Sequence, residues 1–324
     1  MQLKHTLTAT SLACLLPLTA LAEGLTLPED ISFYGKAEIQ LNFTDKGKTS
    51  AQDGLRYVSE GTQIDSPFSR IGFKGSHKLS ESLSGVFKFE YQVKGFDSST
   101  DTLTARNTYI GLKGNFGEVV FGRNDTRFKA SEGKFDLFNE TVADIGQVLA
   151  GQDRLGDTLT YTSPRFSTVQ VAFTAAPKDD SGASDNGYAW SVTAGDKTMK
   201  KSPYYAAYAG TQDLGGLTMQ RILLNYRIEA LTLGALLQQS ETSDGSKDGN
   251  GYMLNAAYST GNIVTKIQYA SDDSKIRHSE ESEQLTIGAD YLFDKQTKIY
   301  VLYTHIDLET SNDNNLGFGL KYNF

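Results

Sequence analysis

The chain has 324 residues, with 31 Lys and Arg against 39 Asp and Glu, and its formal net charge of −8 excludes the basic face that nucleic-acid binding needs. Mean hydropathy is low at −0.38, although the chain holds 17 Tyr, 17 Phe and 31 Gly. The single cysteine, Cys14, lies near the start, so we expect no disulfide and no cysteine metal ligand in the rest of the chain.

The first 22 residues have the pattern of a secretory signal. Lys4 supplies a basic start, the apolar stretch 12–21 follows, and Ala20-Leu21-Ala22 is a small-residue cleavage site. We expect cleavage after this site and a single mature domain of residues 23–324.

Two other interpretations of this segment are disfavoured. A membrane anchor would need a longer apolar stretch, and Pro17 interrupts this one. A lipoprotein would be acylated at Cys14, but Ser11 stands where such sites usually carry Leu. A secreted chain whose signal is removed remains the prediction.

Alternation of apolar and polar residues is the clearest pattern in the rest of the chain. It runs without a break through residues 31–43 and recurs in 83–94 and 316–324. A period of two excludes a helix and predicts strands with one apolar face. In the first segment the apolar or small set is Phe33, Gly35, Ala37, Ile39, Leu41 and Phe43, and the polar set is Tyr34, Lys36, Glu38, Gln40 and Asn42.

Similar segments follow one another through the mature chain, separated by Gly, Asn, Asp and Ser. Their spacing predicts sixteen strands, and an even number is typical of bacterial outer-membrane barrels. The strands are expected at 31–43, 68–76, 83–95, 106–114, 117–123, 157–164, 168–176, 187–195, 203–210, 218–228, 230–239, 251–259, 262–271, 283–292, 297–307 and 315–324.

The connections alternate between short and long, as they do in outer-membrane barrels with short periplasmic turns. Residues 124–156 show no strand pattern and are too long for an ordinary connection, so we expect them to be functional. Tight turns are expected at 115–116, 165–168, 228–230 and 259–262, and longer polar loops at 44–67, 177–186, 240–250, 271–282 and 308–314.

The strands fit a closed transmembrane barrel better than a soluble β-sandwich. A sandwich buries its apolar faces against a second sheet, whereas here the opposite face of each strand is rich in Lys, Glu, Gln, Asn and Thr. A closed ring would turn the apolar face to lipid and enclose a polar lumen. Because lipid offers backbone groups no hydrogen-bond partners, the first strand must pair with the last, which ends at Phe324.

Several motifs, in order and spacing, resemble the general porin family of Gram-negative bacteria. They are FYGKA at 33–37, FSRIGFKG at 68–75, RNTYIGLKGNFGEVVFG with the following Arg-Asn at 106–124, TYTSP at 160–164, and the terminal Phe324. The resemblance implies an all-β, 16-stranded antiparallel transmembrane barrel whose long third loop, 124–156, folds into the lumen. It also implies a water-filled channel of the outer membrane for passive diffusion of small hydrophilic solutes and ions.

The same resemblance implies the partners. The barrel would form a homotrimer among outer-membrane lipid and lipopolysaccharide, and the barrel-assembly machinery would recognise Phe324.

The resemblance also implies a set of site residues, because the third loop of enteric members carries two carboxylates that face a row of basic side chains. Matched motif by motif, the basic row is Lys36, Arg70, Arg106 and Arg154, and the loop carboxylates are Asp136 and Glu140. Enteric loops have Pro before the second acid and two glycines soon after it, and this chain has other residues there. We therefore expect a different bend at the loop tip.

Physical chemistry supports a filter of this kind. Like charges clustered in a narrow lumen are costly and need a reason. Bases on one wall and acids on the opposite loop create a transverse field, which low-dielectric walls focus across the water. Such a field favours polar solutes over apolar ones, while the balance of charge sets the ion preference. The opposed charges leave the sign of that preference open.

Other functions are less well supported. A substrate-specific channel would show a file of aromatic residues, and 124–156 contains three Phe and no Tyr or Trp. An outer-membrane enzyme would need a nucleophile near a histidine, but His77, His278 and His305 are widely separated and no catalytic or nucleotide-binding motif occurs. We expect no enzyme activity, no cofactor and no metal. A role of the external loops as adhesin or phage receptor stays open.

Overall fold

A computed structural model describes residues 30–46, 60–66, 68–94, 102–178 and 186–324. The predicted signal segment, 1–22, lies outside these residues. Within the described part of the chain, no helix is long and apolar enough to cross a membrane.

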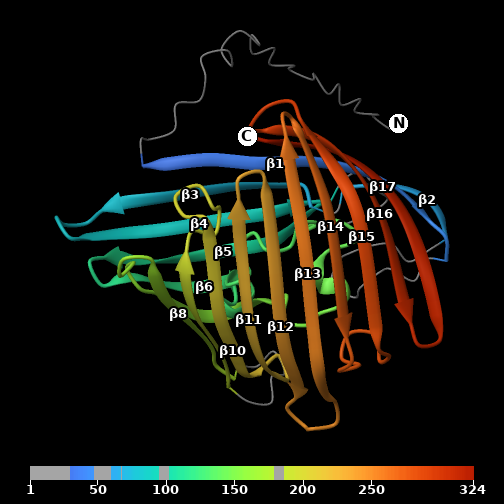
Figure 1. The fold of residues 1–324 in the computed structure, drawn as a ribbon. Helices are drawn as coiled ribbons and strands as arrows, with labels where there is room; N and C mark the ends of the chain where they lie inside the picture. The colour runs from blue at the N-terminus through green and yellow to red at the C-terminus, as the bar shows by residue number, and fades with distance from the viewer. Residues whose placement is uncertain (1–29, 47–59, 67, 95–101, 179–185) are drawn as a thin grey trace, which may run out of the picture.

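In the part of the chain that the structure describes, seventeen strands form one antiparallel sheet that closes on itself (Figure 1). A short helix, α1 (Arg127–Ala130), and a 3₁₀ turn, η2 (Ile145–Gln147), lie in the long connection between β6 and β7. The strands are β1 (Ile31–Thr44), β2 (Gly61–Asp65), β3 (Arg70–Lys78), β4 (Leu83–Val93), β5 (Leu103–Gly114), β6 (Gly117–Asp125), β7 (Arg154–Thr162), β8 (Val169–Ala176), β9 (Gly187–Gly195), β10 (Tyr204–Leu214), β11 (Leu217–Ile228), β12 (Leu231–Thr242), β13 (Asp248–Thr260), β14 (Ile263–Asp272), β15 (Ser282–Leu292), β16 (Thr297–Leu308) and β17 (Ser311–Asn323).

The seventeen strands fill sixteen positions, because β2 and β3 pair with successive parts of β1. The other edge of β1 pairs with β17, which closes the ring. At this seam the Gly35 N–H donates to the Phe324 carbonyl at 2.9 Å, and the Phe324 N–H donates to the Gly35 carbonyl at 3.1 Å. The prediction of a 16-stranded antiparallel barrel, with the first strand paired to the last, is confirmed.

Strand boundaries differ from the sequence prediction at the ends of several strands. Residues 61–65 form β2, although they were expected within a loop, and β13 and β17 begin at Asp248 and Ser311, earlier than expected. The outward residues at such ends, for example Asp248 and Asn250, are polar and exposed. Period-two hydrophobicity marks only the part of a strand that faces lipid, so it misses strand residues that extend beyond the membrane.

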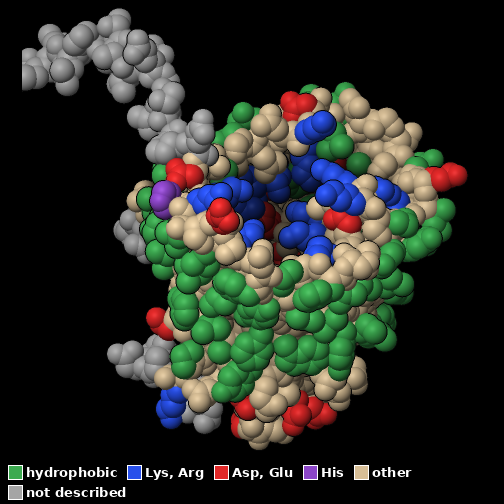
Figure 2. Space-filling model, turned by 90° about the vertical axis from the view of Figure 1, so that its left-hand side faces the viewer, with side chains coloured by type: hydrophobic (Ala, Val, Ile, Leu, Met, Phe, Trp, Pro, Cys, Tyr) green, Lys and Arg blue, Asp and Glu red, His purple; other side chains and the backbone are tan. Residues whose placement is uncertain are grey.

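The two faces of the wall have the predicted character. On β1, Lys36, Glu38 and Gln40 point inward and are almost fully buried, while Phe33 and Phe43 on the other face are exposed. Figure 2 views the end of the barrel at which β3 turns into β4: Lys and Arg side chains surround an opening, and an apolar band covers the outer wall below it.

The long connection between β6 and β7 folds inside the ring, as predicted, and packs against one side of the wall (Figure 1). It carries an apolar core of its own, which buries inward side chains of β10 to β14. Where the loop covers it, the inner wall therefore carries apolar side chains among its buried polar ones, because burial away from water favours apolar contacts there. The largest cluster is Phe135, Ile145, Val148, Leu149, Tyr205, Ala207, Leu223, Leu236, Met253 and Ala270.

Candidate functional site

The side of the wall that the loop leaves open carries the predicted basic row. Lys36 lies on β1, Arg70 on β3, Arg106 on β5 and Arg154 at the start of β7. Strand alternation turns Lys36 and Arg106 inward, and both are at least nine-tenths buried. Lys36 and Arg70 are directly opposite in the β1–β3 register. Like charges in that position destabilise a sheet, so the pair requires a counter-charge.

Glu140, on the loop, supplies that counter-charge. Its carboxylate oxygen Oε2 lies 2.5 Å from Nζ of Lys36, and its Oε1 accepts a hydrogen bond from Nη1 of Arg70. Nη2 of Arg106 lies 3.5 Å from the same Oε1, and Nζ of Lys321 on β17 lies 3.8 Å from Oε2. The structure thus brings one predicted carboxylate together with three members of the basic row.

The backbone of Glu140 is fixed in the left-handed region, with φ of 64°. For a residue with a side chain this conformation costs about 1–2 kcal/mol. Two contacts hold it: the Glu140 N–H donates to Oδ2 of Asp144 at 2.8 Å, and its carbonyl accepts from Nε2 of Gln40 at 2.9 Å. The loop tip therefore turns at the acidic residue itself, without the glycines of the enteric pattern.

The surrounding charges keep Glu140 ionised. Burial alone would raise the pKa of its carboxyl group, but Lys36, Arg70, Lys321 and Arg106 together outweigh burial and hold the pKa well below its usual range. Opposite charges within a few ångströms favour the ionised form in this way.

Asp136, the other predicted carboxylate, has different surroundings. Its oxygens accept hydrogen bonds from the backbone N–H groups of Phe138 and Ile145, each at 2.8 Å, and from Nε2 of Gln268 on β14 at 2.9 Å. These contacts fold the loop and fasten it to the wall. The structure does not bring Asp136 together with the basic row.

Arg154 pairs with Asp125 on β6 rather than with Glu140. Its Nη2 lies 2.9 Å from Oδ1 of Asp125, and its Nε donates to Oδ1 of Asn107 at 3.0 Å. Lys129 approaches the same Asp125 carboxylate at 3.8 Å. Arg154 thus extends the charged wall along β5 to β7 through a separate ion pair.

Several further charged residues of the site were absent from the predicted set, among them Glu38, Glu90, Asp125 and Lys321. Glu38 lies 2.5 Å from Nζ of Lys36, and Glu90 lies 3.0 Å from Nε of Arg106. Alternation on the first and last strands already places Glu38 and Lys321 on the polar face. This alternation was a sequence signal from which both residues could have been added to the predicted site.

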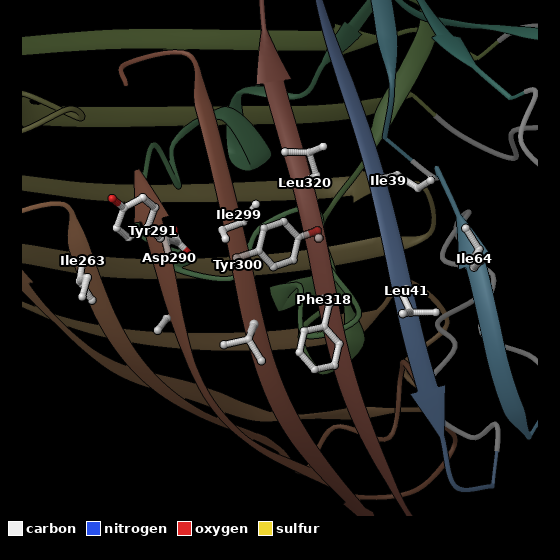
Figure 3. A pocket seen from close by; sticks show the side chains of 13 residues that line it. Ile39, Leu41, Ile64, Ile263, Asp290, Tyr291, Ile299, Tyr300, Phe318 and Leu320 are labelled. Carbon is white, nitrogen blue, oxygen red and sulfur yellow. The ribbon is translucent and has the colours of Figure 1, made fainter. Parts of the chain in front are cut away.

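A polar cavity of about 660 Å³ lies between this wall and the loop. Arg70, Arg106 and Arg154 line it from the wall, and Glu140 lines it from the loop. An apolar groove of about 590 Å³ lies elsewhere, among side chains of β1, β2 and β14 to β17 such as Ile39, Ile64, Phe318 and Leu320 (Figure 3). Outward apolar side chains dominate this groove, so it belongs to the lipid-facing surface.

Among the described residues, no group of three or more His, Cys, Asp or Glu side chains is arranged to hold a metal ion. The cavity instead joins a charged wall to an opposed charged loop.

A closed antiparallel barrel with an apolar exterior, whose inner loop presents charge to a charged wall, defines a transmembrane channel. The sequence profile described as "Gram-negative porin" matches residues 8–313, and the chain belongs to this family. It is therefore a general porin channel of the Gram-negative outer membrane and not an enzyme, as the sequence predicted.

Individual relatives agree with this assignment. The major outer membrane protein P.IB of Neisseria lactamica is 26% identical over 329 residues, which cover 92% of each chain. Among solved structures, an anion-selective porin from Comamonas acidovorans superposes with a TM-score of 0.72 at 20% identity, covering 91% of this chain and 99% of the other. Salmonella typhi OmpF, in complex with daunomycin, gives a TM-score of 0.73 at 16% identity and covers 91% and 97%. These two structures support the fold.

Proposed function

We propose that small hydrophilic solutes and ions pass this porin through a constriction formed by Lys36, Arg70, Arg106 and Arg154 on the wall and Glu140 on the loop. The observation that carries the proposal is the meeting of the Glu140 carboxylate with Lys36, Arg70 and Arg106. The field between them orients polar solutes and penalises apolar ones. Asp136 serves the same constriction by holding the loop in place.

We also propose that the channel prefers anions. Five carboxylates in the ion pairs around the bore are each shared by at least two cations, and nine basic side chains share these five acids. The lining of the polar cavity adds Arg123 and Arg277 against Glu132, Asp144 and Asp153, so positive charges remain in excess by three in a partly dehydrated lumen. The five shared acids are Glu38, Glu90, Asp125, Glu140 and Asp290, and the nine bases that share them are Lys36, Arg70, Lys88, Arg106, Lys129, Arg154, Lys266, Lys298 and Lys321.

The assembly that family resemblance implies is part of the proposal. The porin would work as a homotrimer in a membrane of lipid and lipopolysaccharide, after the assembly machinery has recognised Phe324. This part of the proposal is supported by the position of Phe324, which directly follows the last strand and is partly exposed.

A planar lipid bilayer tests the proposal. Purified protein should give discrete openings in three equal steps, and under a potassium chloride gradient the reversal potential should have the sign of chloride preference. A folded protein that stays electrically silent would refute the diffusion channel. A reversal potential of the opposite sign would refute the anion preference alone, and single openings would refute the trimer alone.

A further inference from the structure

Arg221 is a charged residue in an unusual place. It points inward from β11, beneath the loop and away from the basic row, and only 1% of its surface is exposed. A buried charge is costly unless it is paired and hydrogen-bonded, so its partners indicate what it does.

The guanidinium of Arg221 contacts both limbs of the constriction loop. It lies over the ring of Phe128, 4.4 Å from the centroid, and its Nη1 is 3.8 Å from Oε2 of Glu132. Its Nη2 donates to the carbonyl of Ala150 at 3.2 Å. Phe128 and Glu132 belong to the limb that enters the lumen, and Ala150 belongs to the limb that returns. One side chain therefore joins the two limbs.

We call these contacts of Arg221 with the two limbs the clasp, and two neighbouring residues, Gln238 and Gln152, add to it. Gln238 on β12 accepts from Nε of Arg221 at 2.8 Å and donates to the same Ala150 carbonyl at 3.1 Å. Glu132 also accepts from Nε2 of Gln152 at 2.8 Å, which links the limbs a second time. The planar fork of arginine suits this site, because it can meet an amide, a carbonyl and a carboxylate at once.

From the clasp the loop runs across the wall to its tip. Nδ2 of Asn255 on β13 donates to the carbonyl of Phe135 at 2.9 Å, and Nζ of Lys266 on β14 donates to the carbonyl of Leu137 at 3.1 Å. Glu140 follows three residues later. The contacts of Arg221 at the base of the loop are therefore the start of a series of contacts that leads to Glu140 and to its position against the opposite wall.

We propose that Arg221 is a positioning residue that closes the base of the constriction loop and thereby sets the width of the pore. Arg221 does not touch the solute, because the loop covers it. Its effect on ion preference passes through Glu140, and that part of the inference rests on the proposed filter.

Arg221→Met tests the proposal, since it keeps the length of the side chain and removes the charge and the fork. Arg221→Lys keeps the charge alone. Arg227→Met is the matched control, because Arg227 lies on the same strand with its side chain exposed at the far end. Each variant is first shown to be a folded barrel by its heat-dependent mobility on a gel, and then recorded in planar bilayers.

We expect Arg221→Met to give several conductance levels and noisier openings, and to move the reversal potential toward that of Glu140→Gln. Arg221→Lys should fall between Arg221→Met and the wild type. In the double variant with Glu140→Gln, the effect of Arg221→Met on reversal potential should disappear, because the group that it positions is gone.

A folded Arg221→Met that matches Arg227→Met in conductance, noise and reversal potential would overturn the proposal. If Arg221→Met does not fold, Gln238→Leu decides the matter, since it removes both the acceptor that orients Nε of Arg221 and one donor to Ala150. Wild-type openings from Gln238→Leu would then overturn it. An unchanged reversal potential in Glu140→Gln would instead refute the filter, and conductance and noise would still test Arg221.

Discussion

Glu140 and Lys36 are 104 positions apart in the chain, yet the Glu140 carboxylate lies 2.5 Å from the Lys36 ammonium group. The contact joins the tip of the inner loop to the first strand of the barrel. The carboxylate also offsets the repulsion between Lys36 and Arg70, which lie directly opposite each other in the strand register. One carboxylate therefore stabilises the wall that it faces, and in the proposed constriction it also narrows the bore.

Neutralising Glu140 should strengthen the anion preference. In Glu140→Gln, Lys36, Arg70 and Arg106 keep their charge and lose their shared counter-ion, so the reversal potential should move further toward that of chloride. Stability should fall by about 2 kcal/mol, as for the loss of a charged hydrogen bond. Glu81→Gln, in the exposed turn between β3 and β4, is the control and should change neither quantity. A shift toward potassium would contradict the prediction.

Removing two members of the basic row should act in the opposite direction. Arg70→Ala combined with Arg106→Ala leaves Glu140 and Glu90 with fewer partners, so the channel should shift toward cations. Conductance should rise as well, because two large side chains leave the cavity. Reversal potential and single-channel conductance measure the two effects. The exposed Arg227→Ala should leave both unchanged, and an unaltered reversal potential in the double variant would remove Arg70 and Arg106 from the filter.

The ion pairs of Glu140 should make barrel stability depend on pH in a defined range. Because the pKa of Glu140 is held well below its usual range in the folded protein, its contribution is complete above the unfolded value of about 4.3 and is lost as pH falls through the folded pKa. The difference in melting temperature between wild type and Glu140→Gln should therefore be constant from pH 8 to pH 5 and shrink below about pH 4. A difference that already shrinks between pH 7 and pH 5 would contradict the assignment.

Adding a methyl group at Gly35 should destabilise the seam between the first and last strands. A Cβ there would overlap the ring of Phe324 and lie 2.8 Å from the Arg70 carbonyl oxygen. We expect Gly35→Ala to lower stability by about 1–3 kcal/mol, the usual range for overpacking. Gly85→Ala is the control, because its Cβ would meet nothing closer than 3.8 Å. Thermal loss of the folded band on a gel measures both, and equal melting temperatures would contradict the prediction.

The sequence by itself determined the barrel. Side chains alternate across a strand with a period of two, so Phe33, Lys36 and Glu38 are assigned to their faces by position alone. The same rule placed Lys321 on the polar face of the last strand. It did not find β2, because Gly61–Asp65 is short and shows no run of alternation.

Only the tertiary structure decided which acid meets the basic row. Asp136 and Glu140 lie four residues apart in one loop, and nothing in their local sequence separates them. The path of the loop turns Asp136 toward Gln268 and carries Glu140 across to Lys36. Alternation likewise marks Arg221 as inward without showing that the loop buries it. Local periodicity fixes the direction of a side chain, whereas its partner depends on where distant segments of the chain come to lie.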